Sequence, residues 1–371
     1  MPTTPRSTGS TDSAGSSEPL PTVQAAAAAL QEQLLAQQRD GAPPATVVVL
    51  RRGDGQAAVE HGCADLASGQ PATVRTVFRV ASITKPILSL VAMRLATDGV
   101  LALGRPVHEL VPECAQQPWY QTADPLDVMQ LLSHQSGLLG AEDGKWGDPR
   151  NWPTHTLAGL GDARTGPRGR FAYSNIGFAL GVLAIARAAA APIEELVAAY
   201  VIDPLQLRHT GFLHAAGALT PCPGYTRVEG GFDPDPAKAE HSRGRGYRAV
   251  TGGMYSTADD LASLLVALWT EKLLPRDAVA EWMRPRVEAP GSAKHDAWGV
   301  GIALKRTSAE SVATHGGDFQ GYLARIAFQP DRKVAAVLLR NYSEPDTNIG
   351  ASVVELACQL SGAFPAGATA S

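Results

Sequence analysis

Extended apolar segments stand at the two ends of this chain, and a long, mainly helical stretch separates them. Residues 45–52 and 57–65 read as two strands that a Gly-Asp-Gly turn joins, and residues 311–315, 321–329 and 333–341 read as three more. A strand buries its apolar face only when it pairs with others and is covered. The two groups therefore predict one antiparallel sheet that both ends of the chain complete.

Helical spacing or caps mark the rest of the chain. Amphipathic helices are expected at 23–38 and 347–360, beside the strands, and further helices at 87–98, 126–132, 176–189, 193–201, 257–269 and 276–284. Residues 219–253 are rich in Gly and Pro, with an expected hairpin at 225–232.

The predicted fold class is therefore α+β, with an antiparallel sheet from both chain ends, flanking helices and a mainly helical insert. We expect one unit over 19–371, with a sheet part at about 19–82 and 290–371 and a helical part at about 83–289. A functional site would lie in the cleft between these parts.

Composition excludes several function classes. The net charge of −4 leaves no basic face for nucleic acid and no polybasic patch for a membrane surface. The four cysteines form no C-x-x-C pair, and the nine histidines form no H-x-H or H-E-x-x-H cluster, so neither a metal nor another cofactor is expected.

No secretory signal is expected in the first part of the chain. Residues 1–18 are rich in Ser, Thr, Pro and Gly and predict a disordered tail, without the apolar core of a secretory signal. The Ala-rich stretch at 23–35 is too polar to span a bilayer. We expect a cytoplasmic protein that acts on small molecules.

One pair of residues suggests nucleophilic chemistry. Ser82 and Lys85 stand three residues apart where a short extended stretch meets an apolar helix, so they share a helix face. A serine nucleophile needs a base within hydrogen-bond reach, and a buried lysine with a lowered pKa can provide it. The alternative is an exposed lysine on a capped helix.

Two further segments carry groups that could complete a site. Tyr173 and Asn175 stand two residues apart before a helix; a phenol with a lowered pKa beside a lysine can shuttle protons, and an amide can hold a substrate carbonyl. The alternatives are a packed tyrosine and an asparagine that caps the helix. The turn after the strand at 311–315 carries His315, Gly316 and Gly317, which let a ligand approach the backbone closely.

In this order, S-x-x-K, Y-S-N and H-G-G, these residues resemble the serine β-lactamase and penicillin-binding-protein superfamily, particularly its class C β-lactamase-like esterases and D-peptidases. Supporting segments are L-L-S-H-Q-S-G-L at 131–138, G-G-M-Y-S-T-A-D-D-L at 252–261 and W-G-V-G at 298–301. The likeness runs from about residue 20 to 360.

The resemblance implies that Ser82 is the nucleophile, that Lys85 and Tyr173 are base and proton relay in an order left open, and that Asn175 orients the substrate. It places the oxyanion hole at the backbone N–H groups of Ser82 and Asp318.

His315 and His134 both lie in segments that carry the resemblance. In β-lactamases and penicillin-binding proteins a lysine usually stands at the position of His315 and faces the substrate carboxylate. A largely neutral histidine there favours esters or amides that lack a carboxylate at that point. His134 could be taken for a triad base, but its segment is structural in the family.

The leading hypothesis is an acyl-enzyme hydrolase of esters or amides, and the rival is an ATP-independent transacylase that delivers the acyl group to an amine or alcohol acceptor. A D-peptidase or a true β-lactamase is a weaker match. Aromatic residues that could line a pocket, or simply pack, are Trp119, Tyr120, Trp146 and Trp152.

Overall fold

The structure is a computed structural model of the chain. It describes residues 20–38, 43–121, 123–140, 147–161, 163–234, 246–290, 295–307, 310–343 and 349–362. The predicted tail at 1–18 lies outside these residues.

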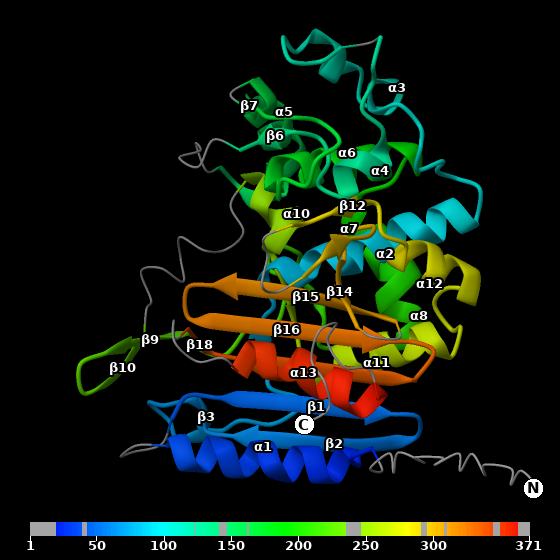
Figure 1. Cartoon of the computed structure of the whole chain (residues 1–371). Helices are drawn as coiled ribbons and strands as arrows, with labels where there is room; N and C mark the ends of the chain where they lie inside the picture. The colour runs from blue at the N-terminus through cyan, green and yellow to red at the C-terminus, as the bar shows by residue number, and fades with distance from the viewer. Residues whose placement is uncertain are drawn as a thin grey trace, which may run out of the picture.

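An eight-stranded antiparallel sheet forms the centre of the molecule, in the order β12–β13–β14–β15–β16–β17–β1–β2 (Figure 1). β1 (Thr46–Arg52) lies between β2 (Gly55–His61) and β17 (Val334–Arg340), so the first and last strands of the chain pair directly. β15 (Ser311–Phe319) and β16 (Tyr322–Gln329) continue the sheet. The predicted sheet from both chain ends is confirmed.

The strands differ from prediction in three places. β12 (Val287–Glu288), β13 (Ala297–Trp298) and β14 (Ala303–Arg306) are too short to show an alternating pattern and were missed. The predicted strand at 57–65 breaks at Gly62, whose φ of +80° turns the chain into β3 (Cys63–Asp65), which pairs with β4 (Gln70–Pro71). β15 runs through His315, Gly316 and Gly317 to Phe319, so these residues form strand and not a turn.

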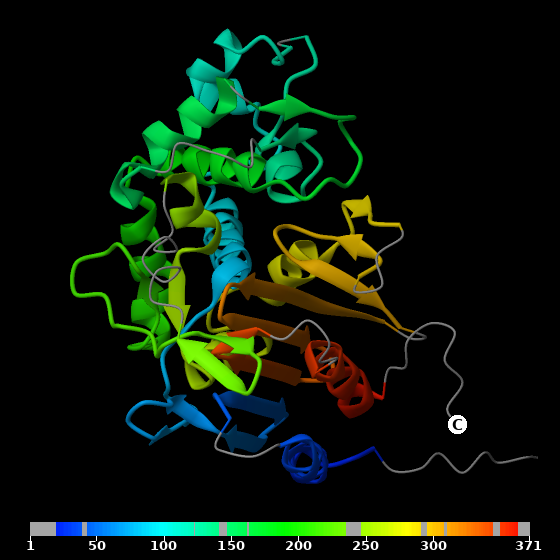
Figure 2. The same ribbon diagram turned by 90° about the vertical axis from the view of Figure 1, so that its left-hand side faces the viewer.

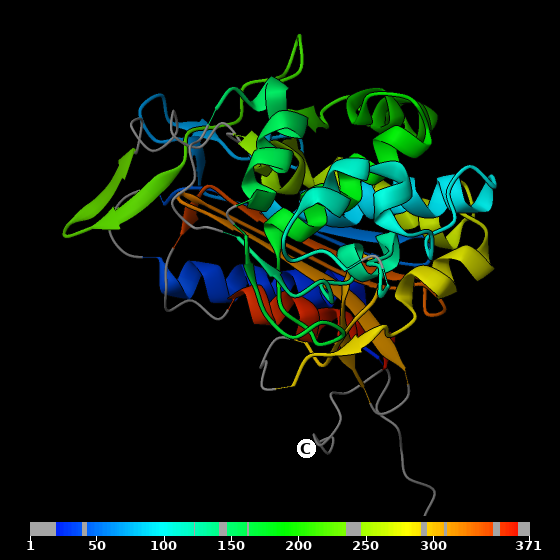
Figure 3. The ribbon, with the colours of Figure 1, turned by 90° about the horizontal axis from the view of Figure 1, so that it is seen from above.

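Each face of the sheet is covered by helices (Figures 2 and 3). Alternation along β1 sends Val48 and Leu50 to the face that α1 (Val23–Gln37) and α13 (Ile349–Ser361) cover. Val47 and Val49 enter the larger core on the opposite face, beneath the helical part of the chain.

The central stretch is helical, as predicted. Its main helices are α2 (Thr84–Thr97), α4 (Val128–Leu132), α5 (Trp152–Gly161), α6 (Asn175–Ala188), α7 (Ile193–Val197), α11 (Ala258–Trp269) and α12 (Arg276–Met283). Shorter ones are α3 (Val107–Leu110), α8 (Asp203–Leu205) and α10 (Ala249–Gly252). Thr257 caps α11 by accepting a hydrogen bond from the Asp260 N–H.

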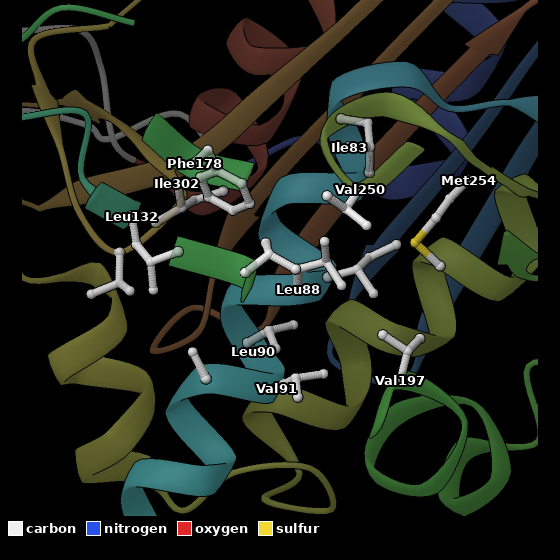
Figure 4. Close-up of a cluster of buried hydrophobic side chains, with 14 of the residues drawn as sticks. Ile83, Leu88, Leu90, Val91, Leu132, Phe178, Val197, Val250, Met254 and Ile302 are labelled. Carbon is white, nitrogen blue, oxygen red and sulfur yellow. The ribbon is translucent and has the colours of Figure 1, made fainter. Parts of the chain in front are cut away.

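Helix α2 is buried on nearly all sides, which explains its almost wholly apolar sequence. Leu88, Leu90 and Val91 pack against side chains from α6, α7 and α10 (Figure 4). A buried helix of this kind holds its first turn rigidly; that turn carries Lys85, and Ser82 lies just before it.

Two small sheets link the parts of the chain. β5 (Phe78–Arg79) pairs with β11 (Met254–Ser256), which also pairs with β8 (Gly211–Phe212). The predicted hairpin is confirmed as β9 (Tyr225–Val228) and β10 (Gly231–Pro234), and β18 (Tyr342–Ser343) pairs with β9 in parallel. β5 leads directly into the turn that carries Ser82.

In the described residues no single helix has the length and apolar character to cross a membrane. The pair made by 175–188 and 193–205 passes such a test only together, and the two are bent by 81°.

Asn341 joins three separate parts of the chain through one buried amide. Its Oδ1 accepts from the Ala45 N–H at 2.7 Å, and its Nδ2 donates to the carbonyls of Ala64 at 2.9 Å and Pro223 at 3.0 Å.

Asn341→Ala leaves these buried backbone groups unpaired, so we expect the free energy of unfolding to fall by about 2–4 kcal/mol in urea titrations. Gln24→Ala, which removes an exposed contact, should change it by less than about 0.5 kcal/mol. Equal effects of the two variants would contradict the assigned role.

Candidate active site

Ser82 lies in a single tight turn between β5 and α2. The turn is a 3₁₀ helix, Ala81–Ile83, so Ser82 precedes the α-helix instead of starting it. Ala81 has a φ of +46°, a left-handed conformation that costs a non-glycine residue about 1–2 kcal/mol. The Thr84 hydroxyl donates to the Ala81 carbonyl at 2.7 Å and the Val80 N–H donates to Met254 at 3.1 Å, which hold the strained turn in place.

Lys85 is completely buried one turn after Ser82. Its Nζ lies 3.2 Å from the Ser82 Oγ and donates to the Thr251 carbonyl at 2.6 Å. Burial holds the pKa of Lys85 well below its usual range, and the positive charge of Arg248 lowers it further. A neutral amine at this distance from a hydroxyl can accept its proton.

Tyr173 lies just before α6, in contact with Ser82. Its side chain hydrogen-bonds Ser82, and the Lys85 Nζ lies 5.0 Å from the centre of its ring. Surrounding protein raises the pKa of the phenol, the hydrogen bond with Ser82 lowers it in part, and the Asp318 carboxylate adds to the rise. The residue as a whole is 40 % exposed, so solvent offsets some of this rise.

The expected lowered pKa of Tyr173 is therefore wrong. The phenol lies among protein atoms and near a carboxylate, and both disfavour a phenolate. Tyr173 is suited to donate a proton, whereas the buried Lys85 is suited to accept one.

Strand β15 closes the site beside the Ser82 turn. A Cβ on Gly317 would lie 2.2 Å from the Val80 carbonyl oxygen and 3.2 Å from the Ser82 nitrogen, so only glycine allows this approach. A Cβ on Gly316 would instead meet the guanidinium of Arg325 on β16. Gly317 thus borders the site, while Gly316 faces the neighbouring strand.

Two ionisable residues of β15, His315 and Asp318, lie at or near the site. Burial, helped by the positive charge of Lys85 when that residue is protonated, lowers the pKa of His315 to about 3, so the ring is neutral near pH 7. Its Nδ1 must donate to the Gly316 carbonyl, 2.8 Å away, because a carbonyl only accepts. The Asp318 carboxylate pairs with Arg325 at 2.9 Å.

The remaining predicted residues divide into two groups. Asn175 is the first residue of α6, two residues after Tyr173, but the helix cap is Ser174, which accepts from the Gly177 N–H at 2.9 Å. Three aromatic residues pack in the helical part with their polar atoms bonded: Trp119 to the Leu160 carbonyl, Tyr120 to His108 and Trp152 to Glu194. Trp146 lies outside the described residues.

The aromatic side chains that do gather beside Tyr173 were not predicted as pocket residues. Trp298 lies with its ring centre 5.0 Å from Phe171, 5.0 Å from His134 and 5.4 Å from His315. Its indole nitrogen is buried and has no hydrogen-bond partner among the residues that the structure describes. The W-G-V-G segment at 298–301 was the available signal, but only the sheet brings it to the site.

The chain was compared with protein-family models, and one described as Beta-lactamase matches residues 28–358. The chain belongs to this family. This confirms the resemblance inferred from the S-x-x-K, Y-S-N and H-G-G segments.

The chain is similar to several known proteins over most of their length. Esterase EstB of Burkholderia gladioli is 28% identical over 309 residues, which cover 73% of this chain and 78% of that protein. The D-alanyl-D-alanine-carboxypeptidase/endopeptidase AmpH of Escherichia coli K12 is 25% identical over 320 residues, 78% of each chain. A D-amino acid amidase from Ochrobactrum anthropi SV3 shares the fold with a TM-score of 0.73 at 22% identity, over 91% of this chain and 97% of that one.

The close approach of β15 to Ser82 predicts unequal effects of alanine at the two glycines. Gly317→Ala must push β15 away from the Ser82 nitrogen, and we expect a loss of turnover of about 100-fold or more. Gly316→Ala should lose much less, because the guanidinium of Arg325 can move aside. Steady-state kinetics with an activated ester measure both, and equal losses would show that the contact with Val80 and Ser82 is not what requires glycine.

The buried lysine predicts a dependence of stability on pH. Between the lowered pKa of folded Lys85 and its ordinary value, the unfolded chain binds more protons, so this residue makes stability rise with pH. Lys85→Met removes that contribution. The stability of the variant minus that of the native chain should be greatest near pH 6 and shrink towards pH 9.5, measured by urea unfolding. A difference that does not change with pH would refute burial of a neutral lysine.

Proposed function

We propose that the protein is a serine hydrolase that cleaves an ester or amide through an acyl-enzyme on Ser82. The observation that carries the proposal is the fully buried Lys85 Nζ, 3.2 Å from the Ser82 Oγ. Family membership and its esterase and peptidase relatives support hydrolysis of this substrate class.

The geometry supports a definite order of proton transfers. The Ser82 Oγ attacks the substrate carbonyl while its proton passes to neutral Lys85. The negative oxygen that forms is stabilised by the backbone N–H groups of Ser82 and Asp318, where β15 lies against the turn. Tyr173 then donates its proton to the departing alcohol or amine and regains one from Lys85. Water attacks the acyl-enzyme by the reverse path and releases the acid.

The charges around the site favour a substrate without a carboxylate beside His315. The ring of His315 is neutral, and the nearby Asp318 already occupies the guanidinium of Arg325. Positive charge reaches the site from Arg248, which acts on Lys85 from η5 (Gly246–Arg248). Neutral esters and amides therefore suit this strand better than carboxylate-bearing β-lactam antibiotics do.

A covalent probe tests the proposal directly. A fluorophosphonate should add one equivalent to the protein, with the adduct on the peptide that contains Ser82 when it is mapped by mass spectrometry. Ser82→Ala should abolish both labelling and hydrolysis of a nitrophenyl ester, because it removes the hydroxyl that the Lys85 Nζ contacts. Ser136→Ala, at another buried serine, is the matched control and should still be labelled on Ser82.

Labelling of another serine, or turnover by Ser82→Ala, would overturn the site. Product analysis by mass, with and without added amines and alcohols, distinguishes hydrolysis from acyl transfer. Release of free acid at a rate that acceptors do not change supports hydrolysis. If acyl-acceptor products are the main species, the reaction is acyl transfer and the proposed hydrolysis is wrong.

A further inference from the structure

We propose that His134 is a positioning residue, which holds Tyr173 against Ser82 and Lys85 by bonding the backbone on both sides of it. This inference rests on the proposed function, in which Tyr173 passes the proton. It assigns His134 no direct part in the chemistry.

The first observation is the pair of backbone contacts. The His134 carbonyl accepts from the Ala172 N–H at 2.9 Å, and its Nδ1 accepts from the Ser174 N–H at 3.2 Å. Tyr173 is the residue between them. Two hydrogen bonds from one residue thus fix the backbone immediately before and after the phenol.

The second observation is ring packing. The imidazole of His134 lies 4.4 Å from the Tyr173 ring, with 33° between their planes. Phe178 lies beyond it, with ring centres 5.9 Å apart, and the Lys85 Nζ lies within 6 Å of both the Tyr173 and the Phe178 ring centres. Because His134 is completely buried, it limits the rotation of Tyr173 away from Lys85.

The third observation is backbone strain at His134. Its φ is +60°, an uncommon conformation for a residue of this size, just after α4 ends. Such strain persists only where the surroundings enforce it. Here the strained conformation turns both the carbonyl and the ring of His134 towards the segment that carries Tyr173.

The protonation state supports the same role. The Ser174 N–H is a donor, so Nδ1 must be unprotonated and the ring proton must lie on Nε2. Burial, helped by the positive charge of Lys85 when that residue is protonated, holds the pKa of His134 well below its usual range, which keeps the ring neutral and the acceptor in place.

Substitutions of His134 can separate the effect of its hydrogen-bond acceptor, Nδ1, from the effect of its ring. His134→Phe keeps an aromatic ring and removes the acceptor, whereas His134→Asn keeps an acceptor near Nδ1, tolerates the positive φ and removes the ring. We expect His134→Phe to lower kcat by about 10–100-fold with little change in KM, because only proton transfer through Tyr173 suffers. His134→Asn should recover most of that loss, and His134→Ala, which has neither group, should not.

Controls distinguish the outcomes. Fluorophosphonate labelling of Ser82 and unfolding curves show whether each variant is folded; if His134→Phe does not fold, the comparison of His134→Asn with His134→Ala decides. In a Tyr173→Phe background the differences among the His134 variants should vanish, since no phenol remains to be positioned. His209→Phe, at a half-exposed histidine, should keep native kcat.

Native kcat in His134→Phe, or equal losses in His134→Asn and His134→Ala, would overturn the role of His134. Unimpaired turnover by Tyr173→Phe would instead overturn the proposed proton relay, whatever the His134 variants do.

Discussion

The antiparallel pairing of β1 with β17 is the interaction on which the rest of the structure depends. Seven residue pairs, from Thr46 with Arg340 to Arg52 with Val334, join strands that lie almost 300 residues apart in the chain. This pairing completes the sheet and creates the face that α1 and α13 cover. It also gives the opposite face the width needed to bury the helical part of the chain around α2.

The site is assembled at a cost in stability that this core offsets. Lys85 is buried without a carboxylate among the hydrogen-bond partners of its Nζ, Ala81 adopts a left-handed conformation, and His134 does the same. Each is unfavourable by itself. All three adjoin Ser82 or Tyr173, so the strain lies where reactive groups must be held close together against their preferred solvation and geometry.

Several polar side chains around the site are buried and uncharged. Burial keeps the rings of His134 and His315 uncharged, and Trp298 and Phe171 add aromatic surface beside them. In such a medium a small number of correctly placed N–H groups stabilises developing charge far more than they would in water. This agrees with a site for neutral ester or amide substrates.

By itself the sequence determined the local secondary structure and the order of the short motifs along the chain. Alternating and helical periodicity predicted the long strands and most helices, because each of these elements repeats its pattern over several turns or residue pairs. The spacing of Ser82 and Lys85 predicted that both lie on one turn. The side chain of Tyr173 and the glycines of the H-G-G segment marked them as candidates, and the resemblance then implied their roles. Only the tertiary structure decided how these groups behave: it buried Lys85, raised the pKa of Tyr173 and carried His315 and Gly317 along a strand past Ser82. It also packed Trp119, Tyr120 and Trp152 in the helical part, each with its polar atom hydrogen-bonded, and brought Trp298 and His134 beside Tyr173. Burial and proximity between distant segments set pKa values and pocket walls, and neither leaves a local pattern in the sequence.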